Sequence, residues 1–125
     1  MYTRRDFGKI ALAAFPASSL LAQKKINSTI GNAKAFLAVQ KEFGSFDEYV
    51  WRFVGGRPRV NQWHALNQVP ARTVESDAMS KEMIGRGFKF VGSTICYAMM
   101  QATGMVNDHL VDCARYKAVT RSPKK

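Results

Sequence analysis

One short stretch of the chain has the residue types of an anion-binding site. Gly92 is followed by Ser93 and Thr94, two residues that favour the N-terminus of a helix. The first backbone N–H groups of a helix point outward and the helix dipole favours negative charge there, so a phosphate is a natural ligand. The stretch therefore predicts a phosphodiester-binding site with a cation at its rim, assigned to Lys89, Phe90, Val91, Gly92, Ser93 and Thr94.

A second pair of residues has the spacing of metal ligands. His109 and Cys113 lie four positions apart, which places both side chains on one face of a helical turn. Together they could bind one Zn²⁺ ion. The same spacing also fits a partly buried histidine beside an unreactive cysteine, and spacing alone favours this second interpretation.

Two helices are predicted to position the anion site. The first covers residues 76–84, with Ser76 as its N-cap. The second is predicted to begin with Ser93 or Thr94 as N-cap and to run to about residue 103, where a glycine follows. The turn between them is short and apolar. The expected unit is a helix, a hairpin and a second helix.

Apolar residues at helical spacing predict the core. Two stripes at helical spacing are predicted to face the core: Ile26, Ile30, Ala33 and Leu37 on a helix capped by Asn27 or Ser28, and Phe46, Tyr49, Val50 and Phe53 on a helix started by Ser45. Packing of the two hairpin helices further requires a shared core of Met79, Met83, Ile84, Phe88, Ile95 and Met99. No stretch shows the sustained alternation that predicts a strand. The expected fold is all-α, with four to five helices.

Length and charge limit the class of protein. A chain of 125 residues forms one domain at most. Lys and Arg total 19 against 9 Asp and Glu, so the net charge is +10 and is spread along the sequence. This balance suits a polyanion such as DNA, although charge alone fits an ordinary basic surface equally well. Two cysteines do not form a disulfide framework.

A longer set of residues resembles a known family. The motifs are Arg86-Gly87-Phe88-Lys89-Phe90-Val91-Gly92-Ser93-Thr94-Ile95-Cys96-Tyr97, then Met100-Gln101-Ala102 and Val106-Asn107-Asp108-His109. They resemble the C-terminal part of bacterial DNA-3-methyladenine glycosylase I, from near residue 30 to about residue 116. This covers about the second half of a family member. The resemblance implies a truncated helix–hairpin–helix DNA glycosylase domain that contacts the DNA backbone in base-excision repair, where the family hydrolyses the N-glycosidic bond of alkylated adenine.

The resemblance also implies a structural zinc ion. His109 and Cys113 match the C-terminal pair of the family's zinc ligands, and the other two ligands belong to its N-terminal segment. The Glu and the aromatic residues that bind the flipped base lie in that half as well. Asn107 stands where the wider superfamily often has a catalytic Asp, a departure that the family shares, and Asp108 follows one position late. We therefore assign no catalytic residue.

The N-terminus has a different character. Arg4 and Arg5 precede a modestly apolar run that is shorter than the ~20 residues that span a bilayer. This pattern predicts twin-arginine export to the periplasm, whereas the family that the chain resembles is cytoplasmic. The predicted division is a signal-like segment (1–22), a junction (23–30), a glycosylase-like helical region (31–116) and a basic tail (117–125).

Three alternatives to an active glycosylase stay open at this point. The first is a catalytically inactive remnant that binds only the DNA backbone. The second is an exported chimeric product with no role on DNA. The third is a chain whose missing half is supplied by a separate polypeptide.

Overall fold

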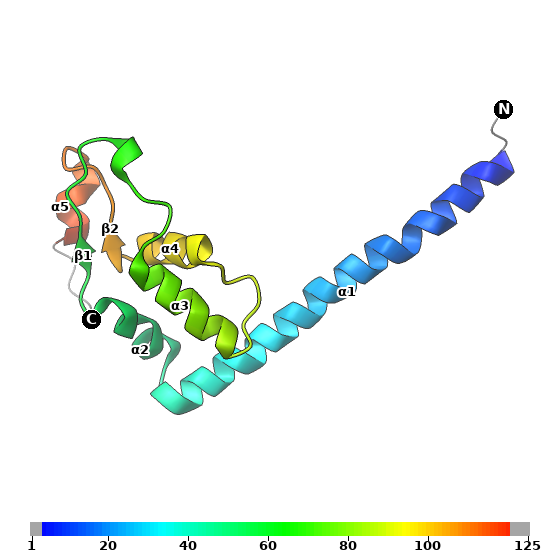
Figure 1. Cartoon of the computed structure of the whole chain (residues 1–125), viewed down its shortest axis with the longest axis horizontal. Coiled ribbons are helices and arrows are strands. Elements are labelled where there is room, and N and C mark those ends of the chain that lie inside the picture. Colours follow the sequence, from blue (N-terminus) through cyan, green and yellow to red (C-terminus); the bar gives the residue numbers. More distant parts are fainter. Residues whose placement is uncertain (1–3, 121–125) are drawn as a thin grey trace.

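The computed structural model describes the backbone of residues 4–120 and the side chains of residues 18–120. It consists of a long helix, α1, whose C-terminal end packs against a compact body (Figure 1). The elements are α1 (Arg4–Phe43), α2 (Phe46–Trp51), β1 (Arg59–Val60), α3 (Val74–Gly85), α4 (Ser93–Ala102), β2 (Val106–Asn107) and α5 (Ala114–Thr120), with 3-10 turns at Arg52–Val54 and Leu66–Gln68. The predicted all-α class is confirmed.

The first helix begins much earlier than predicted. A start at Asn27 or Ser28 is wrong, because α1 runs without interruption through this region. The Ser28 and Thr29 hydroxyls donate hydrogen bonds to the carbonyl oxygens of Lys24 and Lys25, at 2.8 and 3.0 Å. These bonds satisfy the hydroxyls inside the helix, and the Asn27 side chain accepts a hydrogen bond from Gln23 Nε2 at 2.9 Å, so neither Asn27 nor Ser28 caps a helix. The helix crosses the predicted junction at 23–30, but the proposed signal-like segment stays a prediction, since the side chains of residues 1–17 lie outside the described part.

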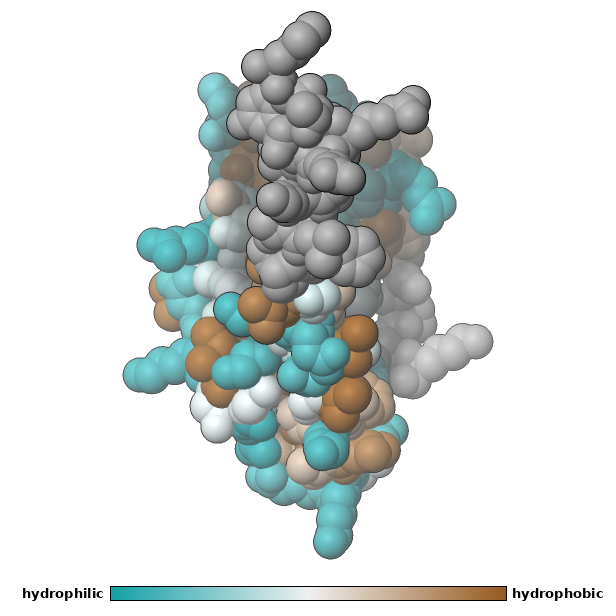
Figure 2. Space-filling view, turned by 90° about the vertical axis from the view of Figure 1, so that its right-hand side faces the viewer, coloured by the Kyte–Doolittle hydropathy of each residue, from teal (hydrophilic) through white to brown (hydrophobic). Residues whose placement is uncertain are grey.

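The predicted core stripe of α1 is wrong as well. Ala35 and Val39 face the body and are buried. The expected stripe lies on the opposite face, and its large members Ile26, Ile30 and Leu37 are each at least 50% exposed. Helical spacing identifies an apolar face, but only the neighbouring elements decide whether that face is covered. Hydrophobic side chains are also exposed among hydrophilic ones on the face seen in Figure 2.

The second helix agrees with its prediction. The Ser45 hydroxyl accepts a hydrogen bond from the N–H of Glu48 at 3.0 Å and caps α2. Tyr49 and Val50 are buried, and Phe46 and Phe53 pack against the same core. The helix ends in a 3-10 turn whose C-cap, Gly55, has a φ of 70°, where a glycine is favoured.

The core around the hairpin is smaller than predicted. Met79, Met83 and Phe88 are buried and Met99 packs against them, as predicted. The prediction is wrong for Ile84 and Ile95, because these residues are 56% and 60% exposed. In each case the neighbouring element covers a different face of the helix.

A two-residue strand pair was not predicted. β1 and β2 pair in parallel, with Arg59 opposite Val106 and Val60 opposite Asn107. The Arg59 N–H donates to the Met105 carbonyl oxygen at 2.9 Å. Strands of two residues are too short to show alternation in a sequence. Their pairing fixes the long loop after α2 to the segment that follows α4.

In the described part of the chain, no helix combines the length and the apolar character that crossing a membrane requires.

Candidate nucleic-acid interface

The two helices of the predicted hairpin unit begin close to each other. Thr73 caps α3, since its hydroxyl accepts from the Ser76 N–H at 3.4 Å and the Ser76 hydroxyl accepts from the Thr73 N–H at 2.8 Å. The prediction of Ser76 as N-cap is therefore wrong by three positions. A capping box needs a second side chain three residues into the helix, and Ser76 fills this inner role while fully buried.

The turn after α3 runs back along that helix. Three hydrogen bonds follow its path: Phe88 N–H to the Met83 carbonyl oxygen at 3.1 Å, the Ser80 hydroxyl to the Val91 carbonyl oxygen at 2.7 Å, and the Ser76 and Ser93 hydroxyls to each other at 2.8 Å. As a result, the start of α4 lies beside the first turns of α3. The unit is held by buried polar contacts as well as by apolar packing.

The N-terminus of α4 has no side-chain cap. Gly92 is the N-cap residue, with φ −60° and ψ 160°, so the prediction that Ser93 or Thr94 caps the helix is wrong. The Ser93 hydroxyl contacts Ser76 instead. A Cβ added at Gly92 would meet no atom within 4 Å. The fold therefore leaves open space in front of this helix end.

The turn itself is anchored to α1. The Asn32 side chain donates to the Lys89 carbonyl oxygen at 3.0 Å and accepts from the Lys89 N–H at 2.7 Å. Of the predicted site residues, Lys89, Phe90, Gly92 and Thr94 are exposed, and Val91 and Ser93 are half-buried. The structure thus brings all six into one turn and the helix end that follows it.

The predicted metal pair is also brought together. His109 Nδ1 lies 3.7 Å from Cys113 Sγ, a separation that fits two ligands of one tetrahedral Zn²⁺. The Asn107 side chain accepts from the His109 N–H at 3.2 Å and steadies the turn. Among the described residues, no three His, Cys, Asp or Glu side chains gather as a metal site needs. Cys96 is buried, and burial raises the pKa of its thiol.

Asp108 is the centre of a hydrogen-bond cluster that sequence reasoning missed. Its carboxylate accepts from Asn61 Nδ2 at 2.7 Å, Trp63 Nε1 at 2.8 Å, Gln101 Nε2 at 3.0 Å and the Tyr97 hydroxyl. The donors lie up to 47 positions away in the chain, so no local pattern indicates them. The cluster ties the loop after β1 to α4.

Burial and hydrogen bonding oppose each other at Asp108. Burial by itself would raise the pKa of the carboxyl, but the hydrogen bonds from Tyr97, Asn61, Gln101 and Trp63 outweigh burial and hold the pKa below its usual value. For Tyr97, burial and the bond to Asp108 both raise the pKa of the hydroxyl. A carboxylate with four donors is a poor base, so this cluster is suited to holding structure together.

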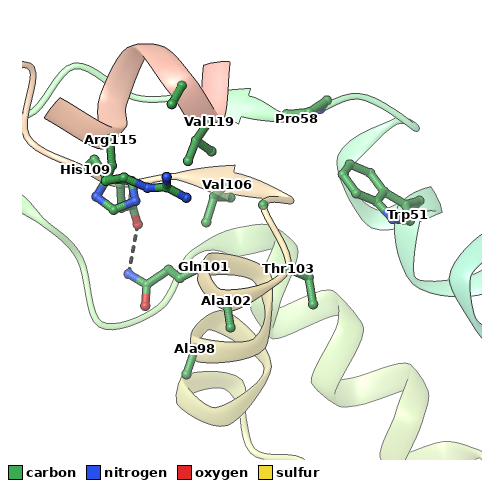
Figure 3. Close-up of a pocket in the computed structure, with 13 residues that line it drawn as sticks. Trp51, Pro58, Ala98, Gln101, Ala102, Thr103, Val106, His109, Arg115 and Val119 are labelled. Carbon is green, nitrogen blue, oxygen red and sulfur yellow. Dashed lines mark hydrogen bonds between the residues drawn. The ribbon is translucent and has the colours of Figure 1, made fainter. Parts of the chain in front are cut away.

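A cavity of about 860 Å³ lies at the opposite end of α4 from the hairpin (Figure 3). The side chain of Trp51 and the segment at Pro58 border one side, and Arg115 and Val119 of α5 border the other. The Gln101 side chain reaches from α4 to the Asp108 carboxylate beside it. The predicted phosphate-binding residues do not line this cavity.

The chain is similar to one group of proteins over most of its length. The family model described as methyladenine glycosylase matches residues 6–116, which begins earlier than the start near residue 30 estimated from motifs. The chain is 50% identical over 92 residues to DNA-3-methyladenine glycosylase 1 of Escherichia coli (strain K12), covering 74% of this chain and 49% of that protein. It is 46% identical over 89 residues to DNA-3-methyladenine glycosylase of Haemophilus influenzae (strain ATCC 51907 / DSM 11121 / KW20 / Rd), covering 71% and 48%.

Solved structures show the same similarity. A crystal structure of 3-methyladenine DNA glycosylase I matches with a TM-score of 0.68 and 49% identity, covering 72% of this chain and 50% of that one. A 3-methyladenine DNA glycosylase I from Staphylococcus aureus, studied for recognition of 3-methyladenine, matches with a TM-score of 0.70 and 26% identity, covering 82% and 51%. The chain therefore spans about half the length of the relatives it matches.

Proposed function

Because this chain belongs to the methyladenine glycosylase family, we propose that it binds the backbone of DNA through the α3–turn–α4 unit, which acts as a helix–hairpin–helix motif. This contact serves the hydrolysis of the N-glycosidic bond of alkylated adenine in base-excision repair. The chain supplies the part of this machinery that holds the DNA.

One observation carries the proposal: the N-terminus of α4 is open and uncapped. Gly92 places no side chain in front of the first amides of the helix, and a Cβ there would find free space. The fold would therefore accept a larger residue at this position. A phosphate that approaches the backbone closely would require glycine there. Lys89 is exposed beside it, and the net charge of +10 attracts a polyanion.

Replacing Gly92 by Ala is expected to weaken DNA binding by about tenfold, the effect of losing one charge-assisted hydrogen bond. The added methyl group blocks the phosphate without disturbing the fold, since it meets no neighbour. Gly31→Ala is the matched control, because a Cβ there also meets nothing. Titration of labelled duplex DNA at several salt concentrations measures both variants. Lys89→Ala should lower the salt slope by ~1.

The outcomes of this titration are distinct. Equal affinity of the Gly92 variant and the wild type would show that the basic surface, and not the hairpin, binds DNA. Absence of salt-dependent binding by the wild-type chain would contradict the proposed function itself.

In the same samples, alkylated DNA is expected to release 3-methyladenine at background level only, since the resemblance places the base pocket in the other half of the family's sequence.

The zinc site is a second proposal that rests on the family. His109 and Cys113 would supply two ligands, whereas a structural zinc ion needs four. We expect the purified chain to lose zinc on mild dialysis, as measured by metal analysis. One tightly bound zinc per chain, lost in Cys113→Ala, would contradict this expectation. It would indicate that Cys96, His64 or a second chain completes the site.

Twin-arginine export is a third proposal, motivated by Arg4, Arg5 and the apolar run that follows. Residues 1–30, fused to a reporter that works only after twin-arginine export, should carry the reporter across the membrane. Lys in place of both arginines should stop the transport. A reporter that stays inside with the native pair would show that this segment is not a signal.

A further inference from the structure

The exposed tip of the hairpin carries an aromatic residue in an unusual backbone conformation. Phe90 has a φ of 60°, and no other non-glycine residue in the described part of the chain has a positive φ. The residue is 75% exposed. An aromatic residue in the left-handed region is strained relative to glycine, and an exposed ring contributes little to the core in return.

The surrounding structure holds this conformation from both sides. On one side, Asn32 of α1 makes two hydrogen bonds to the backbone of Lys89. On the other side, the Val91 carbonyl oxygen accepts from the Ser80 hydroxyl at 2.7 Å and from the Cys96 thiol at 3.4 Å. The ring is therefore presented to solvent on a fixed backbone. Strained residues that persist because their surroundings determine them occur preferentially where a ligand is bound.

We propose that the Phe90 ring stacks on the face of an unstacked nucleobase next to the phosphate held at the start of α4. This inference rests on the proposed DNA contact. It adds that the hairpin recognises a base that has left the stack. In an intact duplex the neighbouring bases cover each base face, and the grooves display only base edges. A ring fixed beside a phosphate site meets a base face only where a base has left the stack. Phe90 thus makes the hairpin prefer DNA that contains unpaired bases.

The test compares Phe90→Gly with the wild type. Glycine removes the ring and suits a φ of 60°, so the variant is expected to unfold at the same temperature or higher. Its affinity for a single-stranded oligonucleotide, and for a duplex with a central mismatch, should fall by about tenfold, which corresponds to the loss of one stacked base. Its affinity for the fully paired duplex should fall by a clearly smaller factor, because that substrate offers the ring no free base face.

The salt dependence separates the ring from the charges. The slope of log affinity against log salt should be the same for Phe90→Gly and the wild type, because a stacked ring releases no counterion. Lys89→Ala should lower that slope on both kinds of DNA. Phe90→Tyr, which keeps an aromatic face, should restore most of the preference for unpaired DNA.

Three results would overturn the inference. One is equal binding of unpaired DNA by Phe90→Gly and the wild type, which would leave the proposed backbone contact intact. Another is a lower unfolding temperature for Phe90→Gly, which would show that the ring has a structural role. The third is failure of the wild-type chain to bind any DNA, which would remove the proposed function together with this inference.

Discussion

Replacing Asp108 by Ala is expected to lower the free energy of unfolding by about 3 kcal/mol, the range for leaving buried hydrogen-bond donors without partners. The change removes the acceptor of Trp63, Asn61, Tyr97 and Gln101 at once. Tyr97 is itself buried, so its hydroxyl loses its partner in a place that water reaches poorly. Urea unfolding followed by circular dichroism measures the effect.

The pH dependence of unfolding tests the same cluster by a different route. The pKa of Asp108 is depressed in the folded state, so ionisation contributes stability that is fully present above the pKa of an unfolded Asp, ~4. This contribution is lost as the pH falls through the lower folded pKa. Asp108→Asn keeps the size of the side chain but does not ionise. Below about pH 4, wild type should lose stability more steeply than Asp108→Asn; parallel curves would show that the carboxylate is not held as described.

Met79→Ala should destabilise the protein by about 3 kcal/mol, the range for emptying a fully buried Met site. Met79 is 0% exposed, whereas Ile84, on the same helix, is 56% exposed. Ile84→Ala is therefore the matched control and should change the free energy of unfolding by about 0.5 kcal/mol or less. Urea unfolding of both variants measures the difference.

The two variants test which of these apolar residues of α3 belongs to the core. The expected packing of the two helices predicts that both belong to the core, and the structure assigns only Met79 to it. Similar decreases in the free energy of unfolding for the two variants would mean that another surface covers Ile84 in solution. A small loss for Met79→Ala would contradict the packing of α3 against α4.

The local parts of the fold follow from the sequence. Ser45 and Gly55 delimit α2 and its 3-10 turn because capping and left-handed glycine depend on residues within one helical turn. The α3–turn–α4 unit was expected for the same reason, although the N-cap of α3, Thr73, lies three positions before the predicted cap. The six residues proposed to bind a phosphate could be named from the sequence because they are contiguous. Sequence motifs likewise led to the family that the comparisons identify.

Contacts between distant residues were decided only by the tertiary structure. Asn32 reaches Lys89 across 57 positions and fixes the hairpin, and Asp108 gathers donors from a loop 47 positions away. The exposure of Ile30 and Leu37 was likewise undetermined by their spacing. Periodicity records which side chains share one face of a helix, because it arises from the geometry of a single element. Burial and long-range hydrogen bonds depend on which other element lies against that face, and this follows from the packing of the whole chain.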